Sequence, residues 1–80
     1  MKYATGQIVK LGDRVAMGGG MTGVVIGCID EGEFADPFLT KEWEFLGVGI
    51  LVKSPEAGVV HYQSPTPDLK LIERSHERIG

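Results

Sequence analysis

The stretch that decides the fold is GDRVAMGGGMTGVVIG, residues 12–27. It places glycines at Gly18, Gly20 and Gly23, the G-x-G-x-x-G spacing that binds a dinucleotide phosphate when a helix follows the glycines. Here residues 24–26 are Val-Val-Ile, and their β-branched side chains favour a strand. We therefore reject a dinucleotide site and expect a strand, a glycine-rich turn and a second strand, which together form one corner of a bent sheet.

Short strands and turns account for the sequence on both sides of this corner. A lead-in strand is expected over residues 3–11, and main strands over residues 14–17, 22–30, 45–53, 59–63 and 68–73. Residues 31–40 form an exposed loop, because Pro37 limits any helix to a short turn near residues 38–43. Five short strands with internal glycines and little helix predict an all-β fold, a small, strongly bent antiparallel barrel. We expect residues 1–80 to be one domain, with residues 75–80 as a frayed tail.

Alternation assigns the inward side chains on the two best-defined strands. Val15 and Met17 share one face of the first, and Val24, Ile26 and Cys28 share one face of the second. Cys28 is the only cysteine, so the chain has no internal disulfide and no cysteine-based zinc site. We expect Cys28 to be a small buried hydrophobe rather than a reactive thiol.

The composition is that of an ordinary soluble domain. Hydrophobic residues make up 42% of the 80 residues, and the apolar runs are far shorter than the roughly 20 residues that span a bilayer. The first residues lack the apolar core of a signal peptide, so we expect a cytoplasmic protein with no membrane contact. The net charge of −3 argues against nucleic acid as the partner, because phosphate binding needs clustered Lys and Arg.

Negative charge is concentrated in residues 30–44. Against one base, Lys41, this segment carries the acids Asp30, Glu31, Glu33, Asp36, Glu42 and Glu44. Trp43 and Phe45 alternate with two of these acids, which in an extended segment places aromatic and acidic side chains on opposite faces. The carboxylates suit a hard cation. Their spacing does not match an EF-hand loop, however, and we expect no metal and no other cofactor.

Two interpretations of this acidic segment remain open. In one, the aromatic side chains close the barrel and the acids keep that end of the molecule hydrated. In the other, the segment is a protein-binding surface in which aromatic anchors are surrounded by carboxylates that steer a basic partner. For this second interpretation the expected contact residues are Glu31, Glu33, Phe34, Asp36, Phe38, Glu42, Trp43 and Glu44.

No catalytic site can be assembled from the sequence. The two histidines are His61 and His76, and neither has a Ser and an Asp at a spacing that indicates a triad. We expect His61 to be structural or solvent-facing and His76 to be solvated in the tail. Without a nucleophile, a base and an orienting group, we do not expect an enzyme.

Residues 12–15, Gly-Asp-Arg-Val, followed by residues 18–25, Gly-Gly-Gly-Met-Thr-Gly-Val-Val, resemble the KOW-type unit of SH3-like barrels. The resemblance implies an SH3-like barrel for this chain. KOW-containing proteins commonly bind ribosomal RNA or the transcription machinery, usually with basic residues in and around the turn. Here Arg14 is the only base between Leu11 and Lys41.

A second resemblance concerns the downstream half. Residues 42–46, 49–52 and 57–62 are similar to small uncharacterised bacterial proteins, some of which are immunity proteins beside secreted toxins. This similarity implies a class of role and assigns no binding residue. Our leading hypothesis is a non-enzymatic protein–protein interaction module, for example an immunity or inhibitor protein, that binds a basic partner such as a toxin through residues 30–44.

The alternative hypothesis is a KOW-like nucleic-acid-binding module associated with the ribosome or with transcription. In that case Lys10, Arg14 and Lys53 would contact phosphates. The sequence leaves the oligomeric state open, since strand edges favour self-association but the composition does not decide it.

Overall fold

The computed structural model describes residues 1–74, with the backbone alone at residues 37 and 38. The expected tail, residues 75–80 with His76, lies outside this range. In chain order the elements are β1 (Arg14–Gly18), β2 (Met21–Cys28), η1 (Ile29–Glu31), β3 (Glu33–Phe34), α1 (Pro37–Trp43), η2 (Glu44–Leu46), β4 (Ile50–Ser54), β5 (Gly58–Tyr62) and β6 (Lys70–Glu73). The two η elements are short 3-10 helices.

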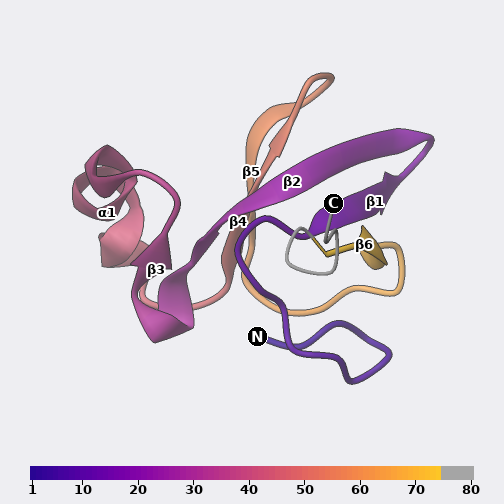
Figure 1. The fold of residues 1–80 in the computed structure, drawn as a ribbon, viewed down its shortest axis with the longest axis horizontal. Coiled ribbons are helices and arrows are strands. Elements are labelled where there is room, and N and C mark those ends of the chain that lie inside the picture. Colours follow the sequence, from indigo (N-terminus) through magenta and orange to yellow (C-terminus); the bar gives the residue numbers. More distant parts are fainter. Residues whose placement is uncertain (75–80) are drawn as a thin grey trace.

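The strands form one antiparallel sheet in the order β5-β4-β2-β1-β6, and the two-residue β3 pairs with β2 (Figure 1). Strands β1, β2, β4 and β5 are neighbours in chain order, while β6 returns to pair with the other side of β1. The prediction of an all-β fold with one short helix after the second main strand is confirmed at this level. The sheet has six strands with β3 included, rather than the five expected.

The expected lead-in strand over residues 3–11 is wrong. This segment turns back on itself instead, with backbone hydrogen bonds from Tyr3 N–H to Gln7 O (2.8 Å) and from Val9 N–H to Met1 O (2.9 Å). The segment therefore lies beside the sheet, where Tyr3 and Val9 are buried in the core.

Two other strands start later than expected. The strand predicted over residues 45–53 begins only at Ile50, because Gly47 and Gly49 have φ values of 76° and 94° that a strand does not adopt. The last strand begins at Lys70 rather than at residue 68. The residues before β4 form the 3-10 helix η2 instead, so the end of the acidic segment is helical rather than extended.

The inward face of β1 is confirmed, whereas that of β2 is wrong by one residue. Val15 and Met17 are buried, as expected, but on β2 Val25 is 1% exposed and Val24 is 42% exposed. A β-bulge between Val25 and Gly27, in the pairing with β4, restores Cys28 to the buried side. Simple alternation fails here because the extra residue of the bulge shifts the phase of the pattern.

The core lies inside the bent sheet. It contains Tyr3, Val9, Val15, Met17, Val25, Cys28, Ile50, Val52 and Leu69. Strands β2 and β4 approach so closely that a Cβ at Gly23 would lie 2.5 Å from Val52 Cγ1. Only a residue without a side chain fits at this crossing.

A buried carboxylate fastens the N-terminal segment to the end of β6. Asp13 is fully buried and accepts hydrogen bonds from Tyr3 O–H (2.7 Å) and Lys10 N–H (3.0 Å). Arg74 Nε lies 3.7 Å from Asp13 Oδ1, and Arg74 Nη2 donates to Ile8 O at 2.5 Å. Burial and the hydrogen bond to Asp13 raise the pKa of Tyr3 well above its usual value of 10.0.

Cys28 is expected to react very slowly in the folded protein. Its thiol is fully buried and contacts Val9 O at 3.7 Å, and burial, followed by the charge of Glu31, raises its pKa to about 11. Since the thiolate is the nucleophile, iodoacetamide at neutral pH should label the native chain at least about a hundredfold more slowly than the chain unfolded in guanidinium. Mass spectrometry of timed samples measures both rates, and equal rates would contradict a buried thiol.

Candidate functional site

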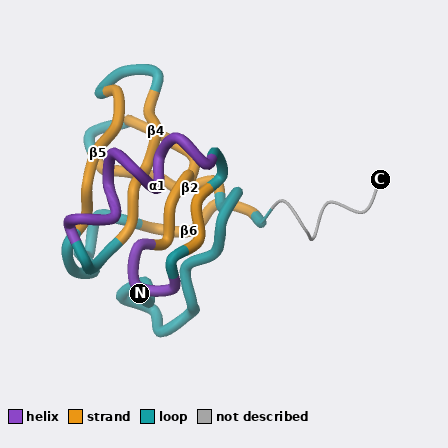
Figure 2. Tube along the Cα trace, turned by 90° about the vertical axis from the view of Figure 1, so that its left-hand side faces the viewer, coloured by secondary structure: helices purple, strands orange, loops and turns teal. Residues whose placement is uncertain are grey.

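The segment between β2 and β4, residues 29–49, leaves and rejoins the sheet at one point. Ile29 N–H donates to Gly49 O at 2.9 Å, and Gly49 N–H donates to Asp30 Oδ2 at 3.2 Å. We call this segment the insert. It carries β3, α1 and η2, and it projects from the sheet at the end opposite β1 and β6 (Figure 1). Viewed from that end, α1 lies in front of the strands (Figure 2).

The inner side of the insert is fixed to the sheet. Phe34 is half-buried and its ring covers Gly27, where a Cβ would lie 3.0 Å from Phe34 Cδ1. Next to it, Ala35 N–H donates to Ile26 O at 2.8 Å. Phe34 was expected to contact a partner, but in this position it packs the insert against β2.

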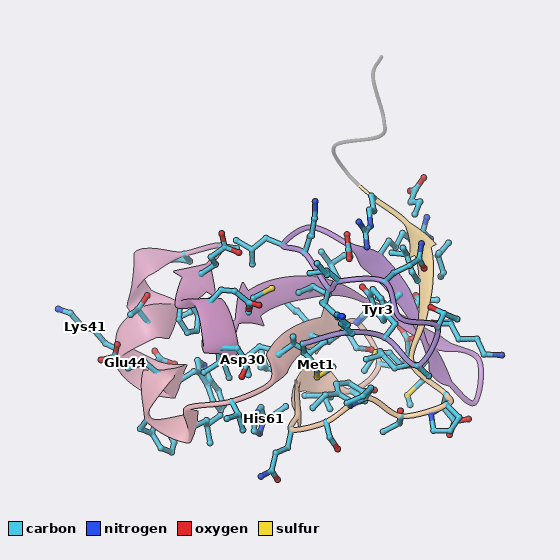
Figure 3. All side chains as sticks on the ribbon, turned by 90° about the horizontal axis from the view of Figure 1, so that it is seen from below. Met1, Tyr3, Asp30, Lys41, Glu44 and His61 are labelled. Atoms are coloured by element: carbon cyan, nitrogen blue, oxygen red, sulfur yellow. The ribbon has the colours of Figure 1, made fainter. Side chains whose placement is uncertain are left out.

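Two carboxylates at the neck of the insert are engaged within the chain. The ammonium group of Met1 lies 3.3 Å from Asp30 Oδ2 and 3.5 Å from Glu31 Oε1, and Figure 3 shows Met1 beside Asp30. Burial lowers the pKa of this ammonium group, but the hydrogen bond and charge of Asp30, together with Glu31, outweigh burial and raise it. Asp30 therefore has a structural role, while Glu31 keeps 43% of its side chain exposed.

The remaining expected acids lie on the surface of the insert. Glu33, Asp36, Glu42 and Glu44 are exposed, as is the base Lys41. Lys41 and Glu44 extend from the insert away from the sheet (Figure 3). The structure thus places these carboxylates at one end of the molecule, as both interpretations of the segment require.

The predicted alternation of aromatic and acidic faces is wrong, because the residues concerned are helical. Trp43 is the last residue of α1 and is half-buried, whereas Phe45 lies in η2. Phe45 is 75% exposed, the largest value among the exposed large hydrophobic residues of the described chain. It was absent from the expected contact residues, although its position between Glu44 and Leu46 on a turn could have indicated it. The side chain of Phe38, in α1, lies outside the described residues.

His61, on β5, contacts the C-terminal end of the insert. Its Nε2 lies 2.8 Å from the carbonyl oxygen of Val48. Val48 itself is 42% exposed and follows η2 closely. Phe45 and Val48 are therefore two exposed apolar side chains on a segment whose end contacts β5.

The bases expected to contact nucleic acid are divided between two surfaces. Arg14 and Lys53 line a hollow on the sheet, on either side of Val24. Lys10 lines a different hollow together with Glu31 and Glu33, so its charge is set beside two carboxylates.

Within residues 1–74, no three His, Cys, Asp or Glu side chains are grouped as a metal site would require. The same part of the chain contains no helix with the length and apolarity needed to cross a membrane. No family model, curated protein or solved structure matches the chain.

Proposed function

We propose that the chain is a non-enzymatic protein-binding module and that the insert is its contact surface for a basic partner. The observation that carries this proposal is Phe45, a large aromatic side chain that is 75% exposed. The exposed carboxylates of Glu42 and Glu44 lie within three residues of it along the chain. An exposed aromatic ring surrounded by charge is the usual composition of an interface anchor with its polar rim.

The fixed neck and inner side of the insert support this assignment. The hydrogen bonds between Ile29, Asp30 and Gly49, the packing of Phe34 on Gly27 and the contact of His61 with Val48 all restrain the segment. A restrained surface loses less conformational entropy when it binds. The exposed acids supply the long-range attraction that steers a positively charged partner.

An immunity or inhibitor protein is the specific form of this proposal. A toxin that acts on nucleic acid must present a positive surface to phosphates, and carboxylates on a rigid insert would occupy that surface by mimicking phosphate charge.

We further propose that the bent sheet is an SH3-like barrel. The support is the strand order, in which four antiparallel strands, β1, β2, β4 and β5, are followed by a last strand that returns to the outer side of the first. The glycine-rich turn between β1 and β2 provides the sharp corner such a barrel needs.

The insert is expected to form a specific photo-crosslink to its partner protein inside the cell that naturally makes the chain. With p-benzoylphenylalanine in place of Phe45, the intact chain should capture a protein with a basic surface. The same photo-reactive residue in place of Gln63, which is exposed and outside the insert, should not capture it. Identical products from both positions would contradict a contact surface centred on Phe45.

Affinity for the captured protein then measures the role of each group. Phe45→Ala should weaken binding at least about thirtyfold, the loss typical of an interface hot spot. Glu42→Lys/Glu44→Lys should weaken binding about tenfold or more and flatten its salt dependence. The matched control is Glu56→Lys/Asp68→Lys, which changes the net charge equally at exposed sites outside the insert. Equal losses in the two charge-reversed variants would contradict the proposal.

A further inference from the structure

A row of three exposed residues crosses the outer face of the sheet. Arg14 on β1 pairs with Val24 on β2, and Val24 pairs with Lys53 on β4. Residues directly opposite one another on neighbouring antiparallel strands project to the same face. Val24 is 42% exposed although β2 is the central strand of the sheet. The row therefore consists of an apolar side chain between two cationic ones.

This row lies in a hollow of about 510 Å³. Arg14, Thr22, Val24, Ile26, Lys53 and Pro55 contribute to its lining. Its volume falls within the range of roughly 300–1,000 Å³ that is usual for sites of small molecules. Val24 and Ile26 give it an apolar floor, since both lie on β2 two residues apart and on the side away from the core.

The charge around the hollow favours an anion. Among residues 1–74, no carboxylate lies within ion-pair distance of Lys53. Arg14 lies 3.7 Å from Glu73, but the two side chains are 55% and 39% exposed, and such surface pairs are weak enough to exchange partners. The carboxylate of Glu56, next to Pro55 in the chain, accepts a hydrogen bond from Thr22 N–H at 3.2 Å.

We propose that this hollow binds a small organic carboxylate with a flat apolar body. The apolar body would cover Val24 and Ile26, and the carboxylate would reach the ammonium group of Lys53 or the guanidinium group of Arg14. Nucleic acid fits the hollow less well, because no aromatic side chain lines it and bases bind such surfaces by stacking on aromatic rings. This site is separate from the insert and does not depend on the proposed function.

The test uses three probes that share a naphthyl ring and carry a negative, a neutral or a positive group: naphthoate, naphthylmethanol and naphthylmethylammonium. Each is titrated into the isotope-labelled full chain, and amide chemical shifts are followed by NMR. Naphthoate should bind at least about tenfold more tightly than naphthylmethylammonium, with naphthylmethanol between them. The shifted amides should belong to β1, β2 and β4. Equal affinities for the three probes, or shifts confined to the insert or to the hollow beside Lys10, would overturn the proposal.

Substitutions in the hollow separate charge from apolar contact. Lys53→Glu and Lys53→Gln should each weaken naphthoate binding, the first by about tenfold or more, and Val24→Asp should abolish it. The matched control Lys41→Glu, on the insert, and the insert variant Glu42→Lys/Glu44→Lys should leave it unchanged. The thermal midpoint of each variant shows whether it is folded. If a short oligothymidylate bound more tightly than naphthoate, the hollow would be a nucleic-acid site and the proposal would be overturned. If the protein's mass in solution rose with its concentration and the self-association prevented naphthoate from binding, the hollow would be an interface with a second copy, which would also overturn the proposal.

Discussion

Replacing Gly49 by alanine is expected to lower the free energy of unfolding by about 4 kcal/mol or more. Gly49 has a φ of 94°, and a Cβ there would overlap the carbonyl oxygen of Tyr62 and lie 3.0 Å from Gln63 Cα. Both obstacles are backbone atoms, so neither can be relieved by rotating a side chain. The hydrogen bonds that close the neck of the insert would have to move as well. Urea denaturation monitored by circular dichroism measures the loss.

Gly32→Ala is the matched control for Gly49→Ala. Gly32 also lies in the insert and has a positive φ of 67°, but a Cβ there would meet no heavy atom within 4 Å. Only the left-handed backbone conformation is penalised, which costs about 1–2 kcal/mol. If the two alanine variants lost equal stability, the close approach between Gly49 and Tyr62 would not be the cause.

The second large effect is expected for Asp13→Ala, at about 3–5 kcal/mol of unfolding free energy. Removal of this buried carboxylate leaves Tyr3 O–H without its hydrogen-bond acceptor and Arg74 without its ion-pair partner, and an uncompensated buried group is costly. Tyr3→Phe should cost only about 1 kcal/mol, because Asp13 Oδ2 retains its hydrogen bond from Lys10 N–H. Glu33→Ala, at an exposed position, is the control and should change stability by no more than about 0.5 kcal/mol.

The same network predicts a loss of stability in alkali. The pKa of Tyr3 is higher in the folded chain than its ordinary value of 10.0, so the folded state holds this proton more tightly than the unfolded state does. The resulting stabilisation is complete below pH 10 and declines as the pH rises further. Cys28 contributes with the same sign between its ordinary value of 9.0 and about 11. Unfolding free energies measured across this range should fall less steeply in Tyr3→Phe, and an unchanged slope would contradict a raised Tyr3 pKa.

The corner of the sheet could be predicted from sequence because the signals there are local. Three consecutive glycines between two strand-like segments determine a turn, and all three, Gly18, Gly19 and Gly20, have positive φ. The inward face of β2 could not be predicted in the same way. Its bulge arises from pairing with β4, a strand more than twenty residues away along the chain, and no local pattern of apolar residues reports such a pairing.

The candidate site was predicted in its charge but not in its geometry. Glu33, Glu42 and Glu44 are exposed on the insert as expected, because isolated acids on a short segment seldom find buried partners. Phe34 and Phe45 have the same side chain, yet one packs on Gly27 and the other faces solvent. Only the positions of β3 and η2 distinguish them, since β3 pairs with β2 whereas η2 packs on α1.

The two ends of the insert are adjacent in space, since Ile29 and Gly49 share a backbone hydrogen bond. The entropic cost of holding the two ends of a loop together rises only slowly with its length, by about 0.6 kcal/mol for each doubling. The strands on either side can therefore carry segments of different size and sequence at this position. Such changes would leave the residues that pack the interior in place.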